Sequence, residues 1–461
     1  MSSENLGFLL VGVFAVIAGA SIVVLLVRSE LAAASGVKSG GRLFLAAALG
    51  MGVIAFTVKL TTFTLMATLP QQVINPLMVE RHISEIVPAE WKRMPGLPQL
   101  DEPYRWQALP SAAPSPANNP TTIEKVELGR RLFFDTNLSL TRDVACASCH
   151  DVPDGTGADG RRTSKGIRGQ IGGRNAPTVW NAAFQAVLFW DGRAASLEDQ
   201  AMGPPLNPIE MGMPSGEAVA QRVIEDKSYR AAFDRAFGKG SEITFERIAQ
   251  AIAAYERTLI TPDTPYDRFV RGERSALTPA QLRGMALFQT TGCIACHSGA
   301  NFSGASFANL ADGDPPSGVA SENGRFRMFP GNDTSYVRRY DLASDKGAAG
   351  PGSDRGIWRI PSLRNVALTG PYLHNGSVDK LEEVVRIMAA SQLGATVGDD
   401  GRLGRTIFWS PTDQSVSKVD RPVLSDTDVK DLVAFLNALS SDELVARVGR
   451  TQARSSASLQ K

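Results

Sequence analysis

Two pentapeptides of the form Cys-x-x-Cys-His hold the residues of this chain that are best suited to chemistry. They span residues 146–150 (CASCH) and 293–297 (CIACH), and they use all 4 cysteines and two of the 4 histidines. Two thiols three positions apart on one helical turn can both add to the vinyl groups of one porphyrin, and the next residue can then offer an imidazole nitrogen to the iron. The pattern predicts two covalently bound haem c groups.

Each haem group needs two thioether bonds and a proximal iron ligand. We expect the thioether bonds at Cys146, Cys149, Cys293 and Cys296, and the proximal ligands at His150 and His297. A zinc site built from the 4 cysteines, or two disulfides, is the alternative. Neither alternative explains why a histidine follows each cysteine pair, so we expect no structural disulfide.

Two apolar runs near the start of the chain predict a membrane anchor. Residues 6–27 carry no charge, and residues 43–69 carry only Lys59. At ~1.5 Å of rise per residue, each run is long enough for a bilayer core of ~30 Å. A secretory signal peptide is the alternative for the first run, but no Lys or Arg precedes it.

The loop between the two runs has more basic than acidic residues, which favours a cytoplasmic loop. We therefore expect residues 1–70 to anchor the chain in a bacterial inner membrane and the rest to lie in the periplasm, where c-type haem is attached. A connector follows over residues 71–120, and its end, 107–120, has the composition of a linker. The connector contains His82, and a lone His is more often solvated or packed than a ligand.

A weak internal repeat precedes the two pentapeptides. Each follows a helix-start pattern with a hydroxyl N-cap and a Glu or Gln three residues later. Each predicted helix then contains a Gly followed four positions later by a Phe. These residues are Thr121, Glu124, Gly129 and Phe133 in the first copy and Thr278, Gln281, Gly284 and Phe288 in the second. The repeat predicts two copies of a small helical haem module.

Amphipathic helices are expected to close both modules. Apolar side chains recur at helical spacing over residues 245–260, and a helix capped by Ser425 and Asp428 follows later. Residues 311–356 are rich in Gly, Asp and Ser and predict a long surface excursion. At 461 residues and a net charge of +1, the chain has room for two or three domains and gives no case for nucleic-acid binding. The expected fold is mainly α, with cytochrome c-like haem domains at 121–265 and 266–440 behind the two-helix transmembrane anchor, and a tail at 441–461.

Several blocks around the pentapeptides occur in a recognisable order. They are 127–135 (ELGRRLFFD), 174–178 (RNAPT), 189–194 (FWDGRA), 208–211 (PIEM), 361–365 (PSLRN), 369–376 (TGPYLHNG) and 381–388 (LEEVVRIM). In order and spacing they resemble the bacterial di-haem cytochrome c peroxidase family, which also contains the methylamine-utilisation enzyme MauG. The resemblance covers about residues 121–440 and leaves out the apolar start and residues 71–120.

The resemblance implies that the two haems differ in role. His150 would be the proximal ligand of the peroxide-reacting iron, and His297 that of an electron-transfer iron. Met388 falls at the family's axial methionine, and a thioether on iron raises the reduction potential. A Met in an amphipathic helix is otherwise a common core residue. Met328 is the second candidate for this ligand.

A peroxide-cleaving site is implied as well. Glu210 corresponds to the family's distal acid–base, Gln200 to its hydrogen-bonding partner and Trp190 to the tryptophan between the haems. A carboxylate over an open iron face can take a proton from one peroxide oxygen and return it to the leaving oxygen. By residue type alone, Glu210 would be an exposed surface residue and Trp190 a core residue.

A calcium ion between the haems is a further implication of the resemblance. Asn175 and the backbone carbonyls of Thr369 and Pro371 match the family's ligands, and such hard oxygen donors suit Ca²⁺. His374 lies next to this site in the sequence and receives no role.

The chain departs from the family at one position. In the best-known members, a histidine in the loop after the first pentapeptide caps the peroxide-reacting iron in the oxidised state. Ile167 occupies that position here, and residues 151–174 contain no histidine. We therefore expect an open, high-spin haem that needs no reductive activation. Lys165 and Met202 are the alternative ligands.

The sequence thus predicts a membrane-anchored di-haem peroxidase that reduces hydrogen peroxide to water. A MauG-like oxidase of a partner protein is the second hypothesis. An electron-transfer subunit of a membrane respiratory complex is the third. A soluble cytochrome c, a cupredoxin or membrane quinol would supply the electrons, and a homodimer is compatible with the resemblance.

Overall fold

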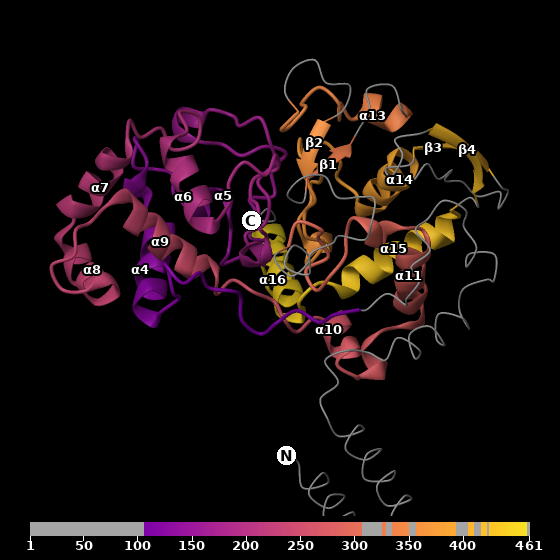
Figure 1. The fold of residues 1–461 in the computed structure, drawn as a ribbon, viewed down its shortest axis with the longest axis horizontal. Helices are drawn as coiled ribbons and strands as arrows, with labels where there is room; N and C mark the ends of the chain where they lie inside the picture. Colours follow the sequence, from indigo (N-terminus) through magenta and orange to yellow (C-terminus); the bar gives the residue numbers. More distant parts are fainter. Residues whose placement is uncertain are drawn as a thin grey trace, which may run out of the picture. The chain divides into compact units, whose positions relative to one another are not determined.

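The computed structural model describes residues 106–306, 325–328, 334–349, 356–392, 404–409, 416–421 and 424–458. All of them belong to one compact unit, Gln72–Lys461. This part of the chain is mainly helical and contains two small antiparallel sheets (Figure 1). Single 3₁₀ turns connect the larger elements: Thr136–Leu138, Ile167–Gly169, Ala182–Phe184, Lys227–Tyr229, Arg274–Ala276, Cys293–Ala295 (η7) and Val366–Leu368.

The first helical group surrounds the first pentapeptide. Its elements are α4 (Ile123–Phe133), α5 (Cys146–Cys149), α6 (Leu197–Leu206), α7 (Gly216–Glu225), α8 (Arg230–Phe237) and α9 (Phe245–Glu256). Helix α4 lies against α9 (Figure 1). Apolar side chains of both helices belong to one hydrophobic core. The amphipathic pattern of α9 explains this position, because Ile248, Ile252 and Tyr255 share its buried face.

The second group surrounds the second pentapeptide. Its helices are α10 (Pro265–Val270), α11 (Pro279–Thr290), α13 (Ser335–Arg339), α14 (Leu381–Ser391) and α15 (Asp426–Ala438). Helix α11 lies against α15 as α4 lies against α9. Both predicted caps are confirmed, since Thr278 with Gln281 and Ser425 with Asp428 each form a complete capping box. The first module's helix begins one residue later than predicted, with Thr122 as its N-cap.

The two helix pairs repeat in detail. A Cβ atom on Gly129 would lie 1.8 Å from the carbonyl oxygen of Ala251, and one on Gly284 would lie 1.9 Å from that of Asp431. The aromatic residue four positions on meets a ring of the partner helix in both modules. The centroid distances are 5.3 Å for Phe133 with Tyr255 and 5.4 Å for Phe288 with Phe435. The Gly–Phe pattern therefore marks a close helix crossing, and the predicted internal repeat is confirmed.

Two short antiparallel sheets belong to the second half of the chain. Strand β1 (Arg325–Met328) pairs with β2 (Gly356–Arg359), and β3 (Gly404–Trp409) pairs with β4 (Val416–Arg421). Strand β1 and helix α13 lie within the stretch expected to be a surface excursion. Strand β2 begins where the predicted excursion ends. Its residues Trp358 and Arg359 lie in the interior and are 2% and 5% exposed.

The first described residues pack against the second module and form hydrogen bonds with it. Trp106 and Leu109 are each 1% exposed, and the backbone N–H of Leu109 donates to Asp267 at 2.8 Å. The carboxylate of Asp267 also accepts two hydrogen bonds from Arg364, at 2.7 and 2.8 Å. Residues 107–120 contain no helix, as expected of a linker, but their beginning is packed rather than free.

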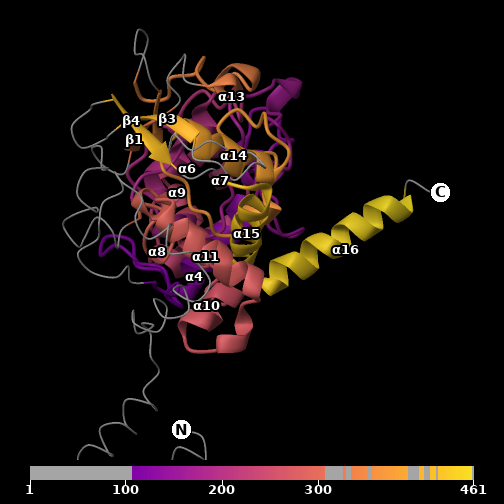
Figure 2. The same ribbon diagram turned by 90° about the vertical axis from the view of Figure 1, so that its right-hand side faces the viewer.

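The last helix, α16 (Asp442–Ser458), follows α15 and projects outward from the other described elements in the view of Figure 2. Its residues nevertheless contact the first module. Leu444 is buried in the core of the first module. Arg447 donates to the carbonyl oxygen of Val152 at 3.0 Å, just after the first pentapeptide. The segment expected to be a tail is thus a helix that holds the loop behind His150 in place.

The expected two-helix transmembrane anchor is corrected by this structure. Across the described segments from residue 106 to residue 458, no helix is long and apolar enough to cross a membrane. The predicted spans, 6–27 and 43–69, lie outside the described residues. That prediction rested only on the length and low charge of two apolar runs, which do not by themselves establish a packed or membrane-spanning helix. Over the residues that the structure describes, the fold is mainly helical and contains no helix that could serve as the predicted anchor.

Candidate active site

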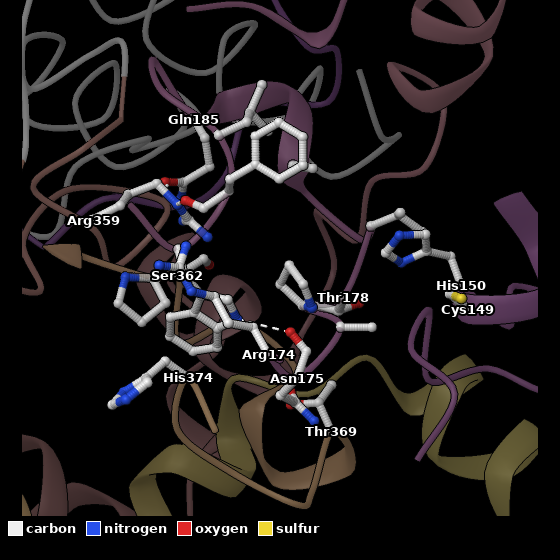
Figure 3. A pocket seen from close by; sticks show the side chains of 18 of the residues that line it. Cys149, His150, Arg174, Asn175, Thr178, Gln185, Arg359, Ser362, Thr369 and His374 are labelled. Carbon is white, nitrogen blue, oxygen red and sulfur yellow. Dashed lines mark hydrogen bonds between the residues drawn. The ribbon is translucent and has the colours of Figure 1, made fainter. Parts of the chain in front are cut away.

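A cavity of about 580 Å³ is lined by residues of both pentapeptides. It also receives side chains from α6, α9, α14 and β2, so both helical groups contribute to it. Figure 3 shows part of its wall, with His150 and Cys149 at one end and His374, Arg359 and Gln185 at the other. Most of the lining is apolar, as is usual for a cofactor site.

The pentapeptides fold as single helical turns, α5 and η7. In both, the backbone N–H of the histidine donates to the carbonyl oxygen of the first cysteine at 3.0 Å. The pairs are His150 with Cys146 and His297 with Cys293. The two thiols and the imidazole therefore lie on one turn, which is the arrangement that thioether attachment and iron ligation require.

The imidazoles are held in the form that binds iron. Nδ1 of His150 lies 3.3 Å from the carbonyl oxygen of Gly157, and Nδ1 of His297 lies 3.0 Å from that of Phe302. Burial lowers the pKa of both rings, and that of His297 to about 4, so they are neutral at pH 7. A neutral ring that donates from Nδ1 keeps the lone pair on Nε2 for a metal.

Among the described residues, the four thiols form no disulfide and no cluster with other side chains that could hold zinc. All four cysteines are free. Burial raises the pKa of Cys146 and Cys296 to about 12, so both free thiols are protonated at pH 7. Within the part of the chain that the structure describes, no group of three or more His, Cys, Asp or Glu side chains is placed to hold a metal ion. The apolar lining of the cavity and the two neutral imidazoles fit a haem group at each pentapeptide.

Glu210 lines the cavity from the loop after α6. The Nδ2 of Asn207 donates to its Oε1 at 2.8 Å, which leaves Oε2 for another partner. Burial raises the pKa of this carboxyl above its usual value, with Arg193 and the Asn207 hydrogen bond opposing the shift. The loop sits close to the segment after the first pentapeptide because Gly166 has no side chain; a Cβ there would lie 1.9 Å from the carbonyl oxygen of Ile209.

Ile167 is joined to the Glu210 loop but does not face the cavity. Its backbone N–H donates to the carbonyl oxygen of Glu210 at 3.0 Å, and its side chain is 2% exposed within the first core. Lys165 and Met202 are also not among the residues that line the cavity, whereas Gln200 is. The structure thus brings the expected distal pair, Glu210 and Gln200, to one cavity wall, and neither of the two substitute ligand candidates, Lys165 and Met202, lines it.

Trp190 lies in the cavity wall and connects several segments. Its indole Nε1 donates to the carbonyl oxygen of Asn175 at 2.8 Å, and its own carbonyl accepts from the N–H of Arg359 at 2.8 Å. Its ring meets His374 edge-on, with centroids 6.5 Å apart. His374 in turn stacks on Trp358, with centroids 4.1 Å apart. The expected tryptophan is therefore one of three neighbouring rings.

The expected calcium ligands all line the same cavity. Figure 3 shows Asn175 and Thr369 side by side, and Pro371 also belongs to the wall. The Nδ2 of Asn175 donates to the carbonyl oxygens of Arg161 and Arg162, at 2.8 and 3.3 Å. This orientation leaves the amide oxygen of Asn175 as an acceptor.

Met388 reaches the cavity from α14. Val384 and Gln392 line the cavity too, and this spacing of four residues places all three on one helix face. Met328 is the last residue of β1, and its side chain lies outside the described part of the chain. His82 is outside it as well.

Sequence comparison assigns the family. A model described as di-haem cytochrome c peroxidase matches residues 123–275. The chain is 35% identical over 339 residues to the cytochrome c551 peroxidase of Pseudomonas aeruginosa, a match that covers 73% of this chain and 85% of that protein. This chain belongs to the di-haem cytochrome c peroxidase family.

Further relatives agree with this assignment. The chain is 36% identical over 327 residues to the cytochrome c peroxidase Ccp of Escherichia coli (strain K12), covering 71% of this chain but only 60% of that protein. Among solved structures, a MauG-like protein associated with microbial copper homeostasis matches with a TM-score of 0.57 and 31% identity, covering 74% of this chain and 97% of that one. The prediction of a peroxidase-like oxidoreductase with two c-type haems is confirmed.

Some cavity residues of this peroxidase-family chain escape sequence reasoning. Glu256, Gln185, Trp358 and Arg359 line the cavity, and all four are at most 5% exposed. No local pattern distinguishes them, because a Glu or Arg in a helix or strand is usually at the surface. Only the packing of distant segments makes these residues part of the site.

Proposed function

We propose that this chain reduces hydrogen peroxide to water with electrons from a c-type cytochrome or cupredoxin in the periplasm. The reaction breaks the O–O bond and consumes two electrons and two protons per peroxide, giving two waters. The observation that carries the proposal is a single cavity that joins a half-buried carboxyl, Glu210, to the first pentapeptide and a thioether, Met388, to the second.

We assign the iron ligands to His150 and His297, with Met388 as the further ligand at His297. A c-type haem supplies an iron that exchanges single electrons and, where one coordination position stays open, can bind peroxide. The chain's contribution is to fix the imidazoles through the carbonyl oxygens of Gly157 and Phe302. Neither Ile167, Lys165 nor Met202 lines the cavity, which supports an open position at the first pentapeptide.

Glu210 is assigned as the proton-handling group. Asn207 holds its Oε1, so Oε2 is the atom that can take a proton from one peroxide oxygen and deliver it to the other. The raised pKa of this half-buried carboxyl favours that exchange, because a group with a pKa nearer the working pH both accepts and releases protons readily. Gln200 lines the same cavity and is assigned to orient the substrate.

We assign electron relay to Trp190. The indole is fixed by its hydrogen bond to Asn175 and lies in the wall shared by both helical groups. The adjacent rings of His374 and Trp358 extend this aromatic wall. Asn175, with the backbone of Thr369 and Pro371, is proposed to hold a Ca²⁺ ion that stiffens this junction.

Oxidation of a partner protein, as in MauG, is the second candidate. The similarity to a solved MauG-like protein favours it. Met388 lines the cavity and favours the peroxidase, because MauG has a tyrosine at the corresponding ligand position. A shared fold cannot separate the two, since the function is set by the site.

Steady-state peroxide turnover with an ascorbate-reduced soluble cytochrome tests the proposal. Glu210→Gln removes the proton-handling carboxyl and should lower kcat/KM for peroxide by a factor of about 10²–10⁴. Glu225→Gln is the matched control, because Glu225 is an exposed carboxyl in the same module, and its turnover should equal that of the wild type. Absorption and EPR spectra of the fully oxidised protein should show one high-spin haem.

Two results would reject the peroxidase mechanism. One is a wild type without peroxide turnover despite full haem content. The other is a Glu210→Gln variant as fast as the Glu225→Gln control. A purely low-spin oxidised protein would instead reject the open position at the first pentapeptide.

A further inference from the structure

A buried arginine faces the cavity without a carboxylate partner. Arg359 is 5% exposed, and burial lowers the pKa of its guanidinium to about 10, with Asp191 opposing. Its Nε donates to the carbonyl oxygen of Phe189 and its Nη1 to Oε1 of Gln185, both at 2.9 Å. Among the described residues no carboxylate forms an ion pair with it, and no acceptor is paired with Nη2.

The nearest acidic group is already neutralised. The carboxylate of Asp191 lies 2.7 Å from Nη1 of Arg174 and 2.9 Å from Nη1 of Arg193. The described residues around Arg359 therefore carry a surplus of positive charge. A buried charge without a counterion costs several kcal/mol in a protein interior (order of magnitude). The surplus predicts an anion that the described residues do not supply.

Gln185 adds a second donor at the same place. Its Oε1 must face Arg359, because a guanidinium only donates, and it also accepts from Ser303 at 3.3 Å. The amide is thereby oriented, and its Nε2 is buried without a hydrogen-bond partner. Gln185 is 4% exposed and lines the cavity together with Arg359, and Figure 3 shows the two at the same end. The cavity wall thus offers an uncompensated cation beside an unpaired N–H₂ group.

We propose that Arg359 and Gln185 form a carboxylate-binding site that holds a propionate of the haem attached at the second pentapeptide. A c-type haem brings two propionates, and a planar guanidinium with an adjacent amide suits a carboxylate. The haem at the second pentapeptide is favoured because this site is connected to His297 by two hydrogen bonds. The hydroxyl of Ser303 donates to Gln185, and the carbonyl oxygen of the preceding residue, Phe302, accepts from Nδ1 of His297. The site rests on the two-haem function proposed above and sets the reduction potential of the electron-entry haem.

Spectroelectrochemical titration of both haems tests this site without peroxide. Arg359→Gln leaves the propionate charge uncompensated, which disfavours adding an electron. The equilibrium constant for reducing the second haem should fall at least tenfold, which is 59 mV for a one-electron couple. Arg235→Gln is the matched control, because Arg235 is an exposed arginine of α8, and it should change that constant by less than about twofold.

A second variant covers the case in which Arg359→Gln does not fold. Gln185→Glu gives Arg359 a carboxylate from the chain itself, so the protein keeps a compensated interior but loses the anion site. Its second haem should also become harder to reduce, by at least tenfold.

Three outcomes would overturn the proposal. They are unchanged potentials in a folded Gln185→Glu or Arg359→Gln protein, a shift confined to the first haem, and a wild-type potential that follows chloride concentration, which would indicate a free anion. A wild type without peroxide turnover would leave the potential shifts intact, so failure of the peroxidase proposal is distinguishable.

Discussion

Replacing Gly129 by alanine forces α4 away from α9, and replacing Gly284 does the same to α11 and α15. The new Cβ atoms would lie 1.8 and 1.9 Å from carbonyl oxygens of the partner helices, and real Cβ atoms essentially never approach closer than 3.0 Å. The clashing atoms are backbone atoms within helices and cannot rotate away. Each helix pair must therefore open by about 1 Å, the difference between these distances.

The cost can be estimated from the geometry. Overpacking of this kind costs ~1–3 kcal/mol, and a gap of ~1 Å loses up to about half of the dispersion energy along the helix contact. Alanine gains ~0.5–1 kcal/mol over glycine inside a helix that has room for it. We expect either substitution to lower the free energy of unfolding by about 2 kcal/mol net.

Urea unfolding followed by far-UV circular dichroism measures this change. Gly449→Ala is the matched control, because Gly449 lies in α16 and a Cβ there would meet nothing within 4 Å. It should stabilise the protein by ~0.5–1 kcal/mol. If Gly129→Ala and Gly284→Ala were as stable as this control, the close helix crossings and the repeated module built on them would be refuted.

Two further changes probe buried charges. Asp267→Asn leaves Arg364 without its charge partner where both side chains are 0% exposed, and it should lower the free energy of unfolding by ~3–5 kcal/mol in the same assay; a loss below ~1 kcal/mol would contradict the buried pair. Burial raises the pKa of Glu256 from 4.5 to about 8, opposed by Arg257 and reinforced by Glu198. Since the folded state binds this proton more tightly, stability present at pH 4.5 is lost as the pH rises through about 8. Between pH 5 and 9, the free energy of unfolding of Glu256→Gln should fall by ~3–5 kcal/mol less than that of the wild type, as an order of magnitude. If both proteins had the same dependence of unfolding free energy on pH, a buried carboxyl at residue 256 would be excluded.

Local chemistry made much of this protein predictable from its sequence. The spacing of two cysteines and a histidine defines a single turn, so the predicted attachment residues could be named without any tertiary information. The same holds for the capping boxes at Thr278 and Ser425, whose partners lie three residues away. The Gly–Phe repeat was readable because both of its residues act on the face of one helix.

The residues expected on the far side of the two irons and between them could be predicted only in part from the sequence. Glu210, Gln200, Trp190 and Met388 were named by resemblance, and the structure places all four in one cavity wall. By residue type alone, none of them differs from a surface carboxylate or a core side chain. Their convergence depends on how α6, the loop after it and α14 pack around the pentapeptides.

Packing between distant segments decided the rest. Arg359 and Gln185 are 174 positions apart, and neither is unusual until the fold buries both and leaves a guanidinium without a counterion. The crossing of α16 to the first module and the stacking of Trp358 on His374 have the same origin. The sequence by itself determined where two haems are predicted to be attached, because attachment needs residues of one turn. What surrounds those haems was decided by the tertiary structure, because burial and charge compensation are properties of several segments at once.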